Sequence, residues 1–304
     1  MERYRSFIFD NARWDEFELR SDDVIVTTPA KAGTTWMQTI CVSLILGAPP
    51  WSSPLDAISP WLDMIVEPVA DVHARLAAQQ HRRVIKTHTP LDGLPAAPGV
   101  RLICVGRDPR DVGLSWDGHI QNTDIENTVT ARVSAVGTHD FDELGIDPTK
   151  PREPPPEDPA ERFGLFVDND ELALQGGSLL GFAHHIAQGW AARDRDDVLL
   201  VHYADLRADR DTEMRRIAAF LGIDIDEDTW PVLVEATGFD AMRARADQLA
   251  PAVSSGIWQD NRTFFAQGRL GGWQSLPAEV LERYDERADE LFTPDLRSWL
   301  ERQP

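Results

Sequence analysis

The chain has 304 residues, 42% of them hydrophobic, and we expect one domain that spans residues 1–304. The formal net charge of −21 argues against nucleic acid as a partner, because phosphate backbones bind basic surfaces. No run approaches the ~18–20 uncharged apolar residues needed to cross a bilayer, and residues 1–17 lack the apolar core of a signal peptide. The expected location is therefore cytoplasmic. Cys41 and Cys104 lie in apolar segments and should be buried free thiols, and no Cys/His spacing predicts a metal site.

Short apolar or β-branched runs predict four buried strands, at residues 24–28, 83–86, 100–105 and 198–202. Helical patterns are found at residues 34–46, from about 110, at 211–221 and at 277–291. Apolar strands that alternate with helices predict an α/β fold, a doubly wound parallel sheet flanked by helices. Two long loops are expected, a Pro-rich one at 147–159 and a second at 249–276.

Lysine is scarce in this sequence. Of the 30 basic Lys and Arg residues, three are lysines, Lys31, Lys86 and Lys150. Because the two side chains are not interchangeable, a lysine in an arginine-rich chain suggests that a compact ammonium group is required. Lys150 lies in the Pro-rich loop, where chance explains it. Lys31 follows the first predicted strand, Lys86 ends the second, and both are candidate functional residues.

The segment that follows the first strand has the features of a phosphate-binding loop. The predicted strand leads into a loop that contains Lys31 and Gly33, and a helix begins directly after it at Thr34. The start of a helix exposes unpaired N–H groups and the positive end of its dipole, so it binds anions. Thr34 and Thr35 can donate hydroxyl hydrogens. The lysine precedes the glycine, unlike in the usual phosphate loop, and a turn with a capped helix is the alternative interpretation.

The segment Lys86-Thr87-His88 ends the second strand. In an extended segment residues two apart share a face, so Lys86 and His88 should point the same way and Thr87 away from them. The carboxyl edge of a parallel sheet is where ligands of such folds bind. A histidine there can act as a general base, although a lone histidine is more often structural.

The third strand is followed by Arg107 and, eight residues on, by Ser115. A guanidinium and a hydroxyl are suited to hold a phosphate. Pro109 fits the first turn of a helix. For Arg110, Asp108 and Asp111 we expect ion pairing on the surface.

Together the three motifs resemble the PAPS-dependent sulfotransferase family, in which PAPS is 3'-phosphoadenosine-5'-phosphosulfate. The family has a Lys-x-Gly-Thr-Thr-Trp loop, a Lys-Thr-His segment and an Arg-(x)7-Ser element in this order, and the match runs from about Val24 to Trp273. The phrases IKTHTPLDGL, VGRDPRD and HYAD especially resemble actinobacterial glycolipid sulfotransferases. The resemblance implies a P-loop-type sheet, PAPS as donor and no metal.

The resemblance also implies roles for individual residues. His88, Lys31 and Lys86 would be catalytic. Trp36 would stack on the adenine, and Tyr203, Thr237 and Phe239 would lie near the adenosine. The remaining expected contacts of the donor come from the loop, the 3'-phosphate element and the C-terminal loop: Lys31, Ala32, Gly33, Thr34, Thr35, Arg107, Ser115, Gln267, Gly268 and Arg269.

One departure from the family pattern concerns the 3'-phosphate. The family has Phe-x-Arg-Lys-Gly-x-x-Gly-x-Trp near its C-terminus, whereas this chain has FFAQGRLGGW, with Ala266 and Gln267 in place of the basic pair. Arg269 or Arg262 could supply the missing charge. Each lost charge-assisted contact would cost ~1.5–3 kcal/mol, so weak donor binding or an altered nucleotide preference stays open.

The predicted reaction is transfer of a sulfuryl group to a hydroxyl of a small organic or glycolipid acceptor. His88 would take the hydroxyl proton, Lys31 would neutralise the leaving phosphate, and Lys86 would stabilise the sulfuryl oxygens. Candidates for an apolar acceptor pocket are Trp51, Trp61, Met64, Phe163 and Phe166, for which core packing is the alternative. The rival functions are an inert 3'-phosphoadenylate-binding protein and a nucleotide-dependent kinase.

Overall fold

The computed structural model describes residues 1–145, 155–172, 177–252, 255–265 and 270–302. Four strands form one parallel sheet in the order β2-β1-β3-β4: β1 (Val24–Thr27), β2 (Val84–Thr87), β3 (Arg101–Gly106) and β4 (Val198–His202). In this register Val26 lies beside Lys86 on one side and Ile103 on the other. The predicted strands are confirmed to within one residue at each end, and so is the parallel pairing.

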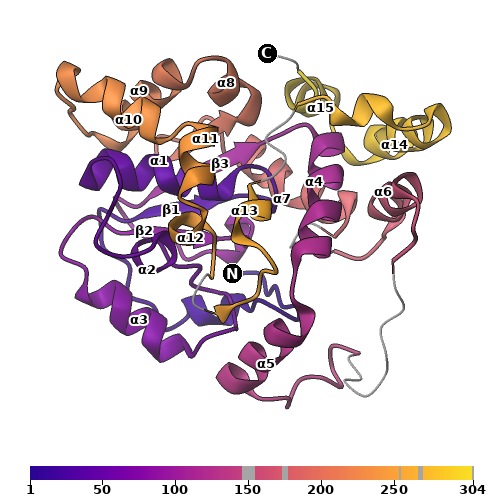
Figure 1. Ribbon diagram of the computed structural model, residues 1–304, viewed down its shortest axis with the longest axis horizontal. Helices are drawn as coiled ribbons and strands as arrows, with labels where there is room; N and C mark the ends of the chain where they lie inside the picture. The colour runs from indigo at the N-terminus through magenta and orange to yellow at the C-terminus, as the bar shows by residue number, and fades with distance from the viewer. Residues whose placement is uncertain (146–154, 173–176, 253–254, 266–269, 303–304) are drawn as a thin grey trace.

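Helices cover both faces of the sheet (Figure 1). They are α1 (Thr34–Leu46), α2 (Leu55–Ile58), α3 (Val69–Ala78), α4 (Pro109–Asn122), α5 (Ile125–Val136), α6 (Pro159–Asp168), α7 (Leu179–Ala191), α8 (Tyr203–Ala208), α9 (Arg210–Leu221), α10 (Trp230–Ala236), α11 (Phe239–Ala244), α12 (Ala246–Leu249), α13 (Asn261–Phe264), α14 (Ala278–Leu291) and α15 (Pro294–Leu300). The four predicted helices correspond to α1, α4, α9 and α14. Where it is described, the predicted loop 249–276 also contains α13 and a short 3-10 helix, η5 (Gly272–Ser275).

Residues of one strand alternate between two apolar cores because successive side chains point to opposite faces. Val24 and Val26 of β1 pack in the core that α1 and α9 complete, whereas Ile25 packs in a second core with Trp14. Both cysteines are buried free thiols, as predicted. Within the described ranges, no helix has the length and apolar character needed to cross a membrane.

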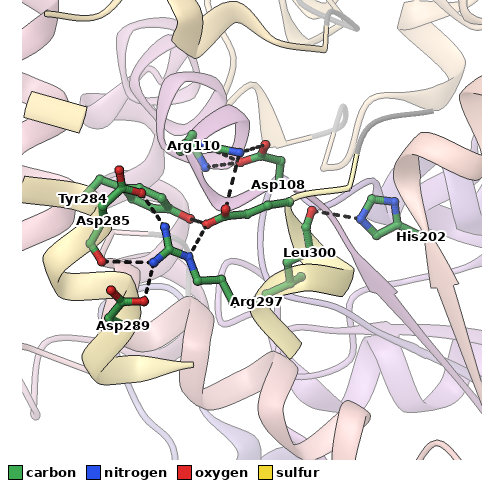
Figure 2. Close-up of polar contacts among 9 residues, drawn as sticks. Asp108, Arg110, His202, Tyr284, Asp285, Asp289, Arg297 and Leu300 are labelled. Carbon is green, nitrogen blue, oxygen red and sulfur yellow. Dashed lines mark hydrogen bonds and ion pairs between the residues drawn. The ribbon is translucent and has the colours of Figure 1, made fainter. Parts of the chain in front are cut away.

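The C-terminal helices are attached to the segment after β3 by a network of charged side chains (Figure 2). Arg110 pairs with Asp108 at 2.7 Å, and Glu301 lies 3.8 Å from Arg110 while it accepts hydrogen bonds from Tyr284 and Arg297, each at 2.9 Å. His202, at the end of β4, hydrogen-bonds the carbonyl oxygen of Leu300 at 3.1 Å. The network therefore connects α14 and α15 to two strand ends.

The expectation of a surface ion-pair cluster at Arg110 is wrong. The side chains of Arg110 and Asp108 are 11% and 4% exposed, and the Arg110 guanidinium lies 3.7 Å from the ring centre of Trp273. The carboxylate of Asp111 accepts the backbone N–H groups of Gly271 and Gly272 at 3.0 and 3.1 Å, and it has no ion pair within 4.0 Å among the described residues. Helices from the far end of the chain cover this segment, a contact that a local sequence pattern does not reveal.

Replacement of Arg110 by Ala should destabilise the fold strongly. The change leaves the buried Asp108 carboxylate without its guanidinium, which typically costs about 3–5 kcal/mol. The matched control is Arg195→Ala, since Arg195 pairs with Asp197 on the surface at 51% and 40% exposure, and such a pair is worth roughly 0–1 kcal/mol. Denaturant unfolding measures both variants, and equal losses would contradict a structural role for the buried pair.

Candidate active site

A cavity of about 360 Å³ opens where the strands end. Its wall is largely apolar, but Lys31, Lys86, Arg107 and His88 all line it. No Asp or Glu is among the described residues that line it, although the whole chain carries a net charge of −21. The expected convergence of Lys31, Lys86 and His88 is therefore present, in a pocket whose charged groups are positive.

The loop between β1 and α1 has the backbone that an anion-binding turn requires. Gly33 is the N-cap residue of α1, with φ of 114°, and no side chain caps the helix start. A Cβ atom on Gly33 would lie 2.9 Å from Cδ2 of Tyr203. Glycine is needed here both for its positive φ and for the close approach of Tyr203. The first N–H groups of α1 are thereby left for a ligand.

The Lys31 ammonium points into an aromatic corner of the pocket. Its Nζ lies 4.6 Å from the ring centre of Phe264 and 3.4 Å from Nδ1 of His119. Burial lowers the pKa of Lys31 to about 7, and the positive charges of Arg107 and Lys86 act in the same direction. An anion bound in the pocket would reverse this effect.

Lys86 is held against Trp61. Its Nζ lies 4.4 Å from the centre of the Trp61 ring, and its backbone N–H donates to the carbonyl of Pro60 at 2.9 Å. Burial lowers the pKa of Lys86 to about 7, although the carboxylate of Asp63 raises it. Lys31 and Lys86 therefore hold their protons less tightly than ordinary lysines, and an anionic ligand would raise both pKa values again.

The orientation of His88 is fixed through one ring nitrogen. Nδ1 lies 2.7 Å from the carbonyl oxygen of Thr28, which can only accept, so Nδ1 carries the proton. Nε2 of the neutral ring is then an acceptor. Burial, followed by the charge of Lys86, lowers the pKa of His88 well below its ordinary value and keeps the ring neutral. Trp61 meets the ring edge-on, with centroids 4.7 Å apart.

Asp63 holds the segment that carries His88, and sequence reasoning missed it. Its Oδ2 accepts hydrogen bonds from the hydroxyls of Thr87 and Thr89, both at 2.5 Å, and from Nε1 of Trp14 at 3.0 Å. Thr87 therefore points away from Lys86 and His88, as the alternation predicts. No local pattern marks Asp63, because its partners come from two distant parts of the chain, Trp14 and the segment 87–89.

Arg107, two residues before the start of α4, and Ser115, within α4, both line the pocket. Arg107 is buried, donates to the carbonyl of Lys31 at 2.9 Å, and stacks 4.5 Å from the ring centre of Tyr203. Ser115 and Tyr203 line the cavity. The basic residue proposed to hold the 3'-phosphate is thus connected to the phosphate loop through a backbone contact.

The predicted adenine contacts divide into two groups. Trp36 and Phe239 line the pocket, and so do Thr34 and Thr35. Thr237 does not. It is fully buried, its hydroxyl donates to the carbonyl of Leu233 at 3.0 Å, and its own carbonyl accepts Nε1 of Trp36 at 2.9 Å. Its contribution in this structure is to hold Trp36.

Some predicted contacts contribute no side chain to the pocket or lie outside the described residues. Ala32 is buried in the turn. Gln267, Gly268 and Arg269, together with Ala266, fall outside the residues that the structure describes. Arg262, offered as a replacement charge, is exposed and absent from the described cavity lining.

Of the apolar residues predicted to line an acceptor pocket, some line the cavity and others pack in the core. Trp61 and Met64 line the pocket. Trp51 packs against the core that includes α1, and Phe163 and Phe166 are buried in the core formed with Tyr284. For these three residues the core-packing interpretation is the one that the structure supports.

Comparisons with known proteins identify the family. A model of the sulfotransferase domain matches residues 21–295. The chain is 38% identical to a glycolipid sulfotransferase of Mycobacterium bovis and 39% identical to one of Mycobacterium tuberculosis, in each case over 97% of this chain and 93% of the relative. This chain belongs to the sulfotransferase family.

Solved structures agree with the fold class. Mouse sulfotransferase SULT7A1, complexed with PAP (3'-phosphoadenosine 5'-phosphate), aligns with a TM-score of 0.66 at 20% identity, over 95% of this chain and 92% of that one. Retinol dehydratase, in complex with androsterone and PAP, aligns with a TM-score of 0.65 at 18% identity, over 94% and 86%. At these identities the likeness concerns the fold.

Replacement of Gly33 by Ala should weaken binding of PAP at least tenfold, because the added Cβ displaces Tyr203 and strains the loop. The matched control is Gly47→Ala, at the other end of α1. Gly47 also has a positive φ, 86°, but a Cβ there meets nothing within 4 Å. The control should lose stability but keep its PAP affinity within twofold. Calorimetric titration measures the affinities, and equal affinities for the two variants would contradict a ligand-binding role for the loop.

Proposed function

We propose that this protein transfers the sulfuryl group of PAPS to a hydroxyl of a small organic or glycolipid acceptor, with His88 as general base. The observation that carries the proposal is the composition of the pocket. Lys31, Lys86 and Arg107 line an apolar cavity together with His88, and no described lining residue is acidic. An anion bound in this cavity would meet positive charge and no described acidic lining residue, so the pocket favours an anionic ligand.

The residues present fit a sulfonated nucleotide. The uncapped start of α1 and Lys31 would hold its 5' end, and Arg107 with Ser115 would hold the 3'-phosphate. Trp36 and Phe239 offer aromatic surfaces for a base. When bound, the nucleotide supplies an activated sulfuryl group on a phosphate leaving group.

The residues of the chain would then carry the following chemistry. Nε2 of His88 accepts the proton of the acceptor hydroxyl as the new O–S bond forms, while the S–O bond to the phosphate breaks. Lys86 stabilises negative charge on the sulfuryl oxygens, and Lys31 neutralises the phosphate that leaves. The products are a sulfate ester and PAP, and the proton resides on His88.

The acceptor is proposed to be amphiphilic. Trp61, Met64 and Ile257 give the pocket an apolar wall close to His88. The mycobacterial relatives are named glycolipid sulfotransferases, which supports an acceptor that joins an apolar part to hydroxyl groups. Phenols and steroids are the alternative within the same chemistry.

The two rival functions predict different results. An inert binding protein, suggested by Ala266 and Gln267, would bind PAP but transfer nothing to any acceptor. A kinase would use ATP and would lose its activity in EDTA. Assays with labelled PAPS and with ATP, each with and without EDTA, separate the three possibilities.

Replacement of His88 by Ala should lower turnover by a factor of about 10²–10⁴, because the acceptor proton loses its base. Affinity for PAP should stay within about threefold, because the lysines and the loop remain. His139→Ala is the control, since His139 is exposed and lies outside the pocket. Turnover of the His88 variant within tenfold of wild type would remove His88 from the base role.

Affinity for PAP should fall as the pH rises from 7 to 9. Lys31 and Lys86 have pKa values of about 7 in the ligand-free protein, so both lose protons over this range. A bound anion favours the ammonium form, so binding takes up about one to two protons at the upper end. Phosphate groups ionise near pH 6 and so contribute little to this trend. Calorimetry in buffers of different ionisation enthalpy measures the uptake, which Lys86→Arg should reduce by about one proton. An affinity independent of pH would contradict the role of the lysines.

A further inference from the structure

His119 is a pocket residue to which neither the motifs nor the proposed chemistry gives a role. It lies on α4 four residues after Ser115, which places the two side chains on the same face of the helix. Both line the cavity. The imidazole stacks on Trp116, with ring centroids 5.0 Å apart and planes 25° apart, and lies 4.8 Å from the ring centre of Trp258. An imidazole thus sits in an otherwise aromatic wall.

The contact with Lys31 defines the tautomer of His119. Nζ of Lys31 lies 3.4 Å from Nδ1 of His119. When a bound anion keeps Lys31 in its ammonium form, Nζ can only donate, so Nδ1 accepts. Burial lowers the pKa of His119 well below its ordinary value, and the positive charges of Lys31 and Lys86 add to this, so the ring is neutral. The single proton of the neutral ring is therefore on Nε2.

Nε2 of His119 has no hydrogen-bond partner among the residues that the structure describes, and the half-buried ring lines the cavity. In His88 the arrangement is reversed, because Nδ1 donates to Thr28 and Nε2 is the acceptor. The pocket therefore contains two neutral imidazoles with opposite polarity. One is ready to accept the proton of a hydroxyl, and the other is ready to donate to an oxygen.

We propose that His119 determines acceptor specificity: its Nε2–H donates a hydrogen bond to a second oxygen of the acceptor, apart from the hydroxyl that receives the sulfuryl group. The proposal rests on the sulfotransferase function proposed above. It selects sugars and other polyhydroxy acceptors over mono-alcohols, because a site built to hydrogen-bond a hydroxyl discriminates against analogues that lack it. The neighbouring apolar residues Ile120, Ile257 and Trp258 would contact the rest of the molecule.

The test compares two acceptors that carry the same octyl group, octyl β-D-glucoside and 1-octanol. The glucoside is used below its critical micelle concentration and 1-octanol below its solubility limit. Wild type should prefer the glucoside by kcat/KM. His119→Phe keeps an aromatic ring in the wall but removes the donor, and it should lower kcat/KM for the glucoside at least tenfold while 1-octanol changes less than threefold. PAP affinity should stay within threefold.

Two further variants separate the donor from the contact with Lys31. The amide of Gln reaches the position of Nε2, whereas the amide of Asn reaches only that of Nδ1. His119→Gln should therefore keep most of the preference for the glucoside, and His119→Asn should lose it. An equal loss for both acceptors in His119→Phe, or a parallel loss of PAP affinity, would overturn the proposal and assign His119 to donor binding through Lys31.

A binding measurement keeps this result distinct from a failure of the sulfotransferase function. Trp116 stacks on His119, so its fluorescence can report occupancy of the PAP-bound pocket in the absence of turnover. If wild type transfers nothing, the function proposal fails, but tighter binding of the glucoside than of 1-octanol, lost in His119→Phe, still supports the role of His119. Equal affinities for the two compounds would refute it.

Discussion

The arrangement of this protein depends on positive charge held at the carboxyl edge of the sheet without acidic groups in the described pocket wall. Burial of an ammonium group costs several kcal/mol in lost hydration. The two lysines reduce this cost because they can release their protons: their pKa values of about 7 lie far below the ordinary value. A bound anion would restore the charge. The empty pocket therefore avoids much of the cost of buried charge, and the occupied pocket gains the attraction between the ammonium groups and the anion.

Such a pocket needs rigid surroundings, because mobile side chains or water would otherwise screen the charges. Two sets of contacts supply this rigidity. Asp63 receives three hydrogen bonds around the Lys86–His88 segment. Asp108, Arg110 and Glu301 attach the C-terminal helices to the residues just after Arg107 (Figure 2). In each set a buried carboxylate, Asp63 or Asp108, stabilises the structure and is not among the described residues that line the pocket.

The sequence allowed accurate prediction of the parts of the site that are local in the chain. The strands, the turn with Gly33 and the common face of Lys86 and His88 follow from spacing alone. His119 was also within reach, because it stands four residues after Ser115 on one helix, but no motif drew attention to it. The burial of Arg110, the support from Asp63 and the contact of Trp36 with the carbonyl of Thr237 were out of reach, because each depends on partners distant in the sequence.

The different chemistry of arginine and lysine accounts for the presence of lysine at the pocket. Arg83, just before β2, and Lys86, within β2, stand three positions apart and show the difference. Arg83, 3% exposed, is paired with the buried Asp23 at 2.5 Å, whereas Lys86 at the other end of the strand faces Trp61 and the cavity. A guanidinium stays charged at any physiological pH, and at Arg83 a buried carboxylate supplies the permanent counter-charge. An ammonium can lose its proton while it waits for a ligand, and this property makes lysine the suitable cation for a site whose counter-ion arrives with the substrate.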